Sequence, residues 1–390
     1  MLDQLFIQAF ASASTAIFDV GSIMAILMLV FGVLDYRFGD HLREIIVSKK
    51  LDQPWLMAAL ALIPVDGTLL FQYSTYRRRT IRPGSLLGGI IGIGEEATYL
   101  VLSYNPVAWV MIALIKLVTA AVSGFTLNIL DRKNGWAEKL HDADEKAAFD
   151  KDAAMADENF HELPDKFRHK LHHFRYHQLG RMFWLFFAIA LLIKLIVNMI
   201  ARLSSLSMDN FEVLNIPFLH WLAMFGLLLI VGYRVVIWFT TREFGKIFEH
   251  EFEDTGDAIG DLAETCANII MLIFVLTFAV QSLITLVGQD RLIQIFSANA
   301  ILTIMIGALV GLIPGTGASL AFTTLYFTLN QTSGAMPFAA LLSCSIALIG
   351  DSQFVGQVQI KKSQRLLHLI AFALALIVGL LVYWIQTLIA

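Results

Sequence analysis

The sequence predicts an all-α polytopic membrane protein, and its composition and the length of its apolar segments are the observations that predict it. Of its 390 residues, 57% are hydrophobic and 15% are charged, whereas soluble domains carry about 25% charged residues. The mean hydropathy is +0.69. Apolar stretches that approach or exceed the roughly 20 residues of a spanning helix recur along the whole chain. Together these features indicate about ten membrane segments.

All but one of the connections between these segments are short or moderate, and the exception is a large polar insertion. This insertion, at residues 131–181, mixes acidic and basic side chains and contains six of the ten histidines. The apolar segments lie, in chain order, at residues 14–34, 54–76, 84–104, 107–130, 182–202, 216–240, 264–287, 298–330, 337–358 and 366–389.

Two short motifs occur twice, which indicates an internal repeat. A Pro-x-x-Gly motif begins at Pro64 and again at Pro314, and a glycine followed by an acid occurs at Glu95 and again at Asp351. Each repeat then consists of a helix, a Pro/Gly-broken segment, a helix with a central acid and a final helix. The predicted organisation is a first membrane repeat (1–130), a cytoplasmic His- and acid-rich loop (131–181), an intervening helix pair (182–254) and a second membrane repeat (255–390).

The distribution of Lys and Arg distinguishes two topologies by the positive-inside rule. If all ten segments cross the membrane, the basic loop at residues 35–53 faces the side opposite to the three arginines at 77–79, and the rule is violated. If residues 54–76 and 298–330 are instead re-entrant hairpins, these groups and the basic residues of the polar loop share one side. We therefore predict eight spanning helices and two re-entrant hairpins in two inverted repeats.

Inverted repeats with broken helices that meet at the bilayer midplane are the architecture of secondary transporters. Irregular backbone at that depth is tolerated only where protein buries it or where it lines a cavity. The expected location is the plasma (bacterial inner) membrane, as a multi-pass protein with both termini on the non-cytoplasmic side.

Acidic residues at bilayer depth are the main candidates for chemistry, because a carboxylate there is costly and marks an ion or substrate pathway by default. Glu95 and Glu96 lie at the centre of the segment 84–104, which we expect to be one continuous helix. Asp66 lies at the expected tip of the first hairpin, and Asp351 matches Glu95 in the second repeat. These four acids are the predicted ion-binding residues.

Neutral oxygen donors and turn residues accompany these acids. The neutral donors are Thr98, Thr316, Ser352 and Gln353, and the hairpin tips contain Pro64, Gly67, Pro314, Gly315 and Gly317. An oxygen-rich site with two or three carboxylates suits a hard or borderline divalent cation such as Mn²⁺.

We therefore predict a metal site formed by Asp66, Glu95 and Asp351, which converge with Thr316 near the midplane around a pseudo-two-fold axis. A carboxylate at such a site can also load a proton, which would give cation/proton exchange. The open alternative is that these acids pair with the basic side chains that also lie within apolar segments, namely Lys116, Lys194 and Arg234.

The polar loop is a candidate metal-capture segment. His169, His172 and His173 have helical spacing and together suit a transition metal. A histidine-rich tract is only a compositional hint, so a solvated amphipathic loop is the alternative that remains open.

Several other classes of protein are not indicated. The sequence shows neither a phosphate-binding loop nor a nucleophilic triad, so we do not expect an enzyme or an ATP-driven pump, and nothing indicates nucleic-acid binding. The glycine-rich stretch at residues 88–94 lies within an apolar segment, where glycines permit close helix packing or close approach of a substrate. Cys266 and Cys344 are too few for a disulfide framework or a paired-cysteine zinc site.

The motifs quoted above, namely Pro64-x-x-Gly67, Gly94-Glu95-Glu96-Ala97, Ile313-Pro314-Gly315-Thr316-Gly317 and Gly350-Asp351, resemble those of the ten-span heavy-metal exporters related to arsenic efflux permeases and manganese transporters. The resemblance covers most of the chain, including the histidine-rich loop. It implies a membrane exporter. The sequence departs from a pattern of charged ligands at two places. Neutral residues, Ser352 and Gln353, follow Asp351, and a neutral residue, Thr316, stands at the tip of the second hairpin.

The resemblance leaves the substrate open, and the chemistry of the residues decides between the alternatives. A thiol-dependent arsenic permease requires cysteines in the pathway, whereas acids at the hairpin tips favour a divalent metal ion. The prediction is a secondary-active exporter of a divalent metal, foremost manganese. The alternatives are an arsenic-compound efflux permease and, from another class, a non-transporting membrane sensor or scaffold. Expected partners are the lipid bilayer, the metal ion as substrate, protons as coupling ion and a second copy of the chain in a homodimer; no cofactor is expected.

Overall fold

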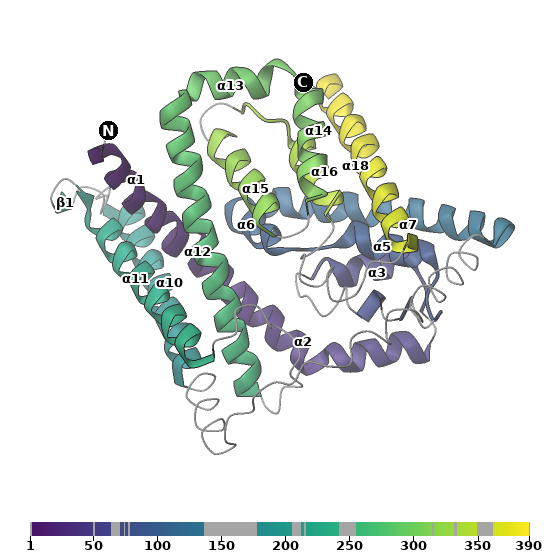
Figure 1. Cartoon of the computed structure of the whole chain (residues 1–390), viewed down its shortest axis with the longest axis horizontal. Helices are drawn as coiled ribbons and strands as arrows, with labels where there is room; N and C mark the ends of the chain where they lie inside the picture. The colour runs from purple at the N-terminus through teal and green to yellow at the C-terminus, as the bar shows by residue number, and fades with distance from the viewer. Residues whose placement is uncertain are drawn as a thin grey trace. The chain divides into compact units, whose positions relative to one another are not determined.

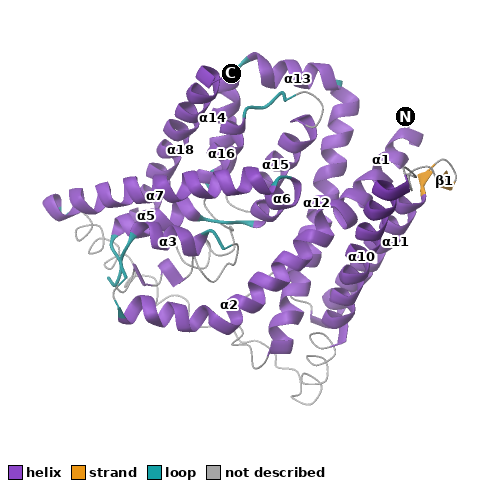
Figure 2. Cartoon of the chain, turned by 180° about the vertical axis from the view of Figure 1, so that it is seen from behind, coloured by secondary structure: helices purple, strands orange, loops and turns teal. Residues whose placement is uncertain are grey.

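The computed structural model describes most of the apolar segments of the chain, and these are helical (Figures 1 and 2). The part of the chain that the structure describes also contains one antiparallel pair of two-residue strands, β1 (Glu212–Val213) and β2 (Ile216–Pro217). The predicted all-α membrane fold is therefore confirmed. The residues that the structure describes are 2–49, 51–63, 71–73, 75–76, 79–135, 178–204, 212–213, 216–241, 255–313, 316–330, 334–348 and 362–389.

Among the described residues, six helices are long and apolar enough to cross a membrane, and the number rises to eight if each of two bent helix pairs is one span. The chain is therefore a multi-pass membrane protein. The six long spans are Leu5–Leu34, Pro106–Lys133, Gly180–Val197, Phe218–Ile237, Leu262–Val287 and Arg365–Ile389.

The chain divides into two compact units. The first unit comprises Met1–Arg37 and Pro164–Leu292, and the second unit comprises Phe38–Leu163 and Ile293–Ala390. Both units therefore contain residues of both predicted repeats. The first helix of each predicted repeat lies in the first unit, and the remainder of each lies in the second unit.

The first unit is a bundle of long helices. Its N-terminal helix runs through α1 (Leu2–Ser14), the π-helix η1 (Thr15–Gly21) and the start of α2 (Ser22–Ser48). This helix packs with the other long helices of the unit, which are α10 (Gly180–Ser204), α11 (Phe218–Thr241) and α12 (Thr255–Val287).

Ion pairs join the helices of the first unit. Lys194 Nζ lies 3.5 Å from the Asp19 carboxylate and donates a hydrogen bond to the Asp19 carbonyl oxygen. Arg234 Nη1 donates a hydrogen bond of 2.7 Å to the Glu264 carboxylate. Lys194 and Arg234, which were considered above as partners of the predicted ion-binding acids, thus pair with other acids in their own unit.

The second unit contains two sets of helices with similar internal contacts. In one set, α3 (Pro54–Ala61) packs on α5 (Pro83–Gly92), which packs on α7 (Pro106–Asn134). In the other set, α14 (Ala300–Gly311) packs on α16 (Phe338–Ile346), which packs on α18 (Lys362–Ile389). Figure 1 shows α14, α16 and α18 side by side. The remaining helices are α6 (Glu96–Tyr104), α13 (Gln289–Ala298) and α15 (Thr316–Asn330).

Glycines permit the closest of these contacts, as the sequence indicated. A Cβ added to Gly92 of α5 would overlap the backbone of Ala58 in α3, and a Cβ added to Gly311 of α14 would overlap the Cys344 carbonyl in α16. Without side chains at these positions the helix backbones approach closely, which is the usual basis of helix association in membranes.

The predicted continuous helix over residues 84–104 is wrong. Helix α5 ends at Gly92, α6 begins at Glu96, and the two are bent by 50°. The cause is a tertiary contact: the Gly94 amide donates a hydrogen bond of 2.7 Å to the Ala61 carbonyl oxygen at the end of α3, instead of to a carbonyl of its own helix. The polypeptide between the two helices is extended, with Glu95 at φ −97° and ψ −176°.

The second predicted hairpin is broken where the sequence placed its tip. Helix α14 ends at Gly311 and α15 begins at Thr316, and these two helices pack against each other. Its first leg is preceded by a sharp 95° bend between α13 and α14, where Asn299 caps α14 by accepting a hydrogen bond from the Leu302 amide. The first leg of the first predicted hairpin, which spans residues 54–76, is helix α3.

Candidate functional site

Glu95 is the one predicted acid whose side chain the structure describes, and it lies in the interior of the second unit. It occupies the N-cap position of α6 and is only 8% exposed. Its Oε2 accepts a hydrogen bond of 3.0 Å from the Ser319 hydroxyl, in the first part of α15. The carboxylate therefore connects the start of one broken helix with the start of another.

The helix ends around Glu95 favour its charged form. The α6 and α15 helices pack against each other, and Figure 1 shows them side by side. A helix N-terminus carries roughly half a positive charge, because its first amide groups lack intrahelical partners. Glu95 lies at the N-terminus of α6 and is bonded to a residue near the N-terminus of α15, so both dipoles stabilise a carboxylate at this point.

Lys116 supplies the positive side chain of this region. It lies in the middle of α7, is 1% exposed, and donates a hydrogen bond of 2.7 Å to the Ile93 carbonyl oxygen. That carbonyl belongs to the extended peptide between α5 and α6, two residues before Glu95. Lys116 and Glu95 interact electrostatically. The sequence-based alternative that a predicted acid interacts with Lys116 thus applies to Glu95.

A small cavity of about 20 Å³ lies beside these groups. A volume of roughly 10–15 Å³ on this scale holds one water molecule, so the cavity accommodates one water or one monatomic ion. Its polar lining consists of Thr98, Lys116, Ser319, Thr323, Cys344 and Ser345.

The structure brings only part of the predicted site together. Thr98 lines the cavity one turn after Glu95, and Gly317 lies in α15, where an added Cβ would meet open space. Glu96 and Thr316 are the first residues of α6 and α15, and their backbone alone is described. The other predicted residues lie outside the described residues: Asp66, Asp351, Ser352, Gln353, Pro64, Gly67, Pro314, Gly315, His169, His172 and His173.

Sequence reasoning missed several residues of this region. Ser319 gave no signal beyond its position one turn after Thr316, because its partner is 224 residues away. Lys116 did carry a signal, as a lone lysine in an apolar segment, but it was considered only as a competing partner. Cys344, one of the two cysteines of the sequence, also lies in the cavity lining.

Within the described part of the chain, no three His, Cys, Asp or Glu side chains group closely enough to hold a metal ion. Glu95 is accompanied there by neutral oxygens and by Lys116. A site with several carboxylates therefore depends on acids from segments that the structure does not describe, and the predicted convergence of Asp66, Glu95, Thr316 and Asp351 stays a prediction.

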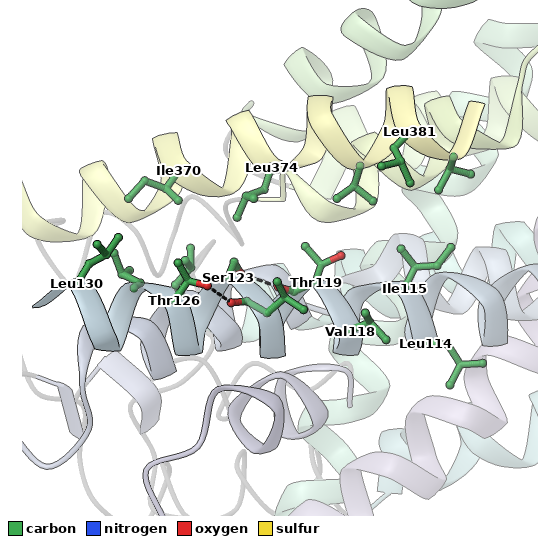
Figure 3. Close-up of a pocket in the computed structure, with 15 residues that line it drawn as sticks. Leu114, Ile115, Val118, Thr119, Ser123, Thr126, Leu130, Ile370, Leu374 and Leu381 are labelled. Carbon is green, nitrogen blue, oxygen red and sulfur yellow. Dashed lines mark hydrogen bonds between the residues drawn. The ribbon is translucent and has the colours of Figure 1, made fainter. Parts of the chain in front are cut away.

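A much larger groove, of about 730 Å³, lies between α7 and α18 (Figure 3). Apolar side chains such as Leu114, Val118 and Leu374 line it. Two of its hydroxyl groups, those of Ser123 and Thr126, donate hydrogen bonds to backbone carbonyls of α7. This chemistry suits hydrocarbon and is unsuited to a metal ion, so the groove is distinct from the region around Glu95.

The long apolar helices and the broken membrane helices are those of a polytopic membrane protein. The chain belongs to the ArsP_2 family, described as "Putative, 10TM heavy-metal exporter", which matches residues 4–386. It is thus a member of a family of heavy-metal exporters with ten membrane segments. No curated protein and no solved structure matches the chain.

Proposed function

We propose that this chain is a secondary-active transporter that exports a divalent metal ion, foremost manganese, through a carboxylate site around Glu95. The observation that carries the proposal is the position of the Glu95 carboxylate, buried at the junction of two broken helices and bonded to Ser319. A buried acid at such a junction costs free energy unless it binds something, so it marks an ion pathway by default.

The surroundings of Glu95 support a small cation as substrate. The cavity has room for one monatomic ion, and the hydroxyl-bearing residues Thr98, Ser319 and Thr323 are among those that line it. Two other lining residues, Leu62 and Leu348, precede Asp66 and Asp351 by four and three positions in the sequence. The other two predicted acids are therefore close in sequence to residues that line this cavity.

The composition of the two units supports the proposed inverted repeats. The first unit contains the first helix of each repeat and the intervening pair, and the second unit contains the broken segments of both. A division of this kind suits a transporter in which one group of helices moves relative to another. The proposed location is the plasma membrane, with the basic loops in the cytoplasm and both termini on the other side.

Substitution of Glu95 tests this proposal in cells that lack their own metal exporters. We expect Glu95→Ala to abolish the manganese tolerance that the wild-type gene confers, with unchanged abundance in the membrane. Asp290→Asn is the matched control, because Asp290 is an exposed acid in α13 of the same chain. Wild-type tolerance in the Glu95→Ala strain would refute the carboxylate site, and a wild-type gene that confers tolerance to no metal would favour a sensor or scaffold.

An arsenic-compound efflux permease is the second candidate, and the position of Cys344 favours it. The Cys344 thiol lies in the cavity lining with Lys116 and Ser319, and thiolates are the soft ligands that soft metal centres select. If the substrate is an arsenic compound, Cys344→Ser should remove arsenic tolerance and leave manganese tolerance unchanged. If the substrate is manganese, the same substitution should have little effect on either.

A further inference from the structure

The apolar groove between α7 and α18 has no part in the proposed transport, and its dimensions fit another ligand (Figure 3). Helix α5 packs against both α7 and α18 and contributes the buried Leu87 to the lining. Leu114 and Leu130 of α7 both line the groove, so it extends along about 24 Å of this helix. This length is most of the roughly 30 Å thickness of the hydrocarbon core of a bilayer, and a lipid acyl chain can lie along it.

Basic side chains follow one end of this groove. Figure 3 shows Leu130 and Ile370 at the same end. Leu130 is followed by Arg132 and Lys133 in the last turn of α7, and Ile370 lies five residues after Arg365, near the start of α18. All three basic side chains are exposed. We call this end, with its three basic residues, the basic end of the groove.

The charge along the groove is asymmetric. The opposite ends of the two helices, residues 106–115 and 375–389, contain no charged residue. At the basic end, Asp131 is the neighbouring acid on α7, and Asp52 is paired at 3.2 Å with Arg82, the residue before α5. The described acids thus compensate only part of the positive charge there, and the groove is apolar along its length and positive at one end.

We propose that the groove is a binding site for an anionic phospholipid, with an acyl chain along its apolar lining and the phosphate group at the basic end. Basic pockets between membrane helices bind anionic lipid headgroups. Arginine pairs with phosphate oxygens through two parallel hydrogen bonds, and lysine contributes a point charge. The lipid bridges α7 and α18 within the second unit, and its binding does not depend on the metal site around Glu95.

A second copy of the chain fits this groove less well than a lipid. All copies insert into the membrane with the same orientation, so a two-fold dimer through the groove would bring the basic end of one copy close to that of the other. Like charges that face each other disfavour association. An anionic headgroup instead compensates the same charges.

Native mass spectrometry of the delipidated full-length protein, released from detergent micelles, tests the inference. The dissociation constant of the first bound lipid is measured for phosphatidylglycerol and for phosphatidylcholine with identical acyl chains, so the two probes differ in the headgroup. We expect phosphatidylglycerol to bind about tenfold more tightly, or better, because three basic residues face its phosphate. Equal affinity for the two lipids would overturn the proposal.

Removal of the basic end should abolish the preference between the two lipids. We expect the triple variant Arg132→Ala/Lys133→Ala/Arg365→Ala to bind phosphatidylglycerol about tenfold more weakly than the wild type and to bind phosphatidylcholine equally well. The matched control removes three exposed basic residues elsewhere in the chain, and thus the same charge, and should keep the wild-type preference: Lys49→Ala/Arg181→Ala/Arg291→Ala. A wild-type preference in the first triple variant would contradict the assigned position of the headgroup.

A bulky side chain in the groove should displace the acyl chain. Thr126 of α7 is exposed and lies between the two helices (Figure 3), so the indole ring of Thr126→Trp would occupy the groove without entering the core. We expect this variant to bind phosphatidylglycerol about tenfold more weakly than the wild type. Leu228→Trp is the control, because Leu228 is an exposed residue of α11 in the first unit. Wild-type affinity in Thr126→Trp would show that the lipid binds elsewhere.

The same spectra report the mass of the protein, which tests the second copy as occupant. A wild-type dimer that shows no lipid preference and dissociates in Thr126→Trp would assign the groove to a second copy and overturn the proposal. The comparison of the two lipids on the wild type needs no variant, so the test holds even if a variant does not fold. None of these outcomes bears on the proposed metal transport, which is tested separately at Glu95.

Discussion

The Ser319 hydroxyl donates a hydrogen bond of 3.0 Å to the carboxylate of Glu95, which is 224 residues away in the sequence, and this contact joins the first turns of α6 and α15. Both residues are buried in the second unit. Because a hydrogen bond to a charged group is stronger than one between neutral groups, this contact fixes the carboxylate at the junction of α6 and α15.

Loss of the Ser319 hydroxyl should weaken the site without removing its charge. A hydrogen bond to a charged group contributes about 1.5–3 kcal/mol, so Ser319→Ala should lower the apparent Mn²⁺ affinity by about tenfold or more. Ser319→Thr should recover much of the loss. Ser103→Ala is the control, because the Ser103 hydroxyl in α6 bonds only to the backbone of its own helix in the described structure. Equal affinity for Ser319→Ala and the wild type would contradict the role of this contact.

A side chain at Gly92 should separate α5 from α3. The added Cβ would overlap the Ala58 backbone, and overpacking typically costs about 1–3 kcal/mol. We expect Gly92→Ala to lower the thermal midpoint of the detergent-solubilised protein. Gly232→Ala, in α11, is the matched control, because its added methyl group meets open space. A Gly92→Ala protein as stable as Gly232→Ala would show that this close approach is not needed.

The Arg234–Glu264 pair should stabilise the first unit only while both charges are present. Both side chains are 13% exposed and their closest atoms are 2.7 Å apart. Removing one partner of a buried pair leaves an uncompensated charge and costs about 3–5 kcal/mol. We expect Glu264→Gln to destabilise the protein and the double variant Arg234→Met/Glu264→Met to regain most of that stability. A double-mutant cycle of denaturation measurements with additive effects would show that the two charges are uncoupled.

The helical fold follows from local features of the sequence, whereas the site depends on contacts between residues that are far apart in the sequence. The long apolar runs predicted the spans, and Pro314 predicted the break between α14 and α15. The break before Glu96 could not be predicted, because the apolar pattern continues through residues 84–104 and the interruption follows from the hydrogen bond between Gly94 and Ala61.

The same distinction applies to individual site residues. Glu95 stood out as a charge in apolar sequence, and so did Lys116, but the sequence does not show that Lys116 bonds to the Ile93 carbonyl. Nothing in the sequence distinguishes Ser319 from other serines, because its contact with Glu95 arises only from the packing of α15 against α6. Which charges pair within a membrane is thus decided by helix packing, and Lys194 and Arg234 illustrate this, since they pair within the first unit.

The most direct test of the central claim is Mn²⁺ transport into inside-out membrane vesicles that contain either the wild type or Glu95→Gln at equal abundance. The glutamine keeps the shape of the side chain and removes its charge, so any difference reports on the carboxylate itself. The account predicts Mn²⁺ accumulation that depends on the wild-type protein and is lost in Glu95→Gln. Accumulation by Glu95→Gln at the wild-type rate would contradict it.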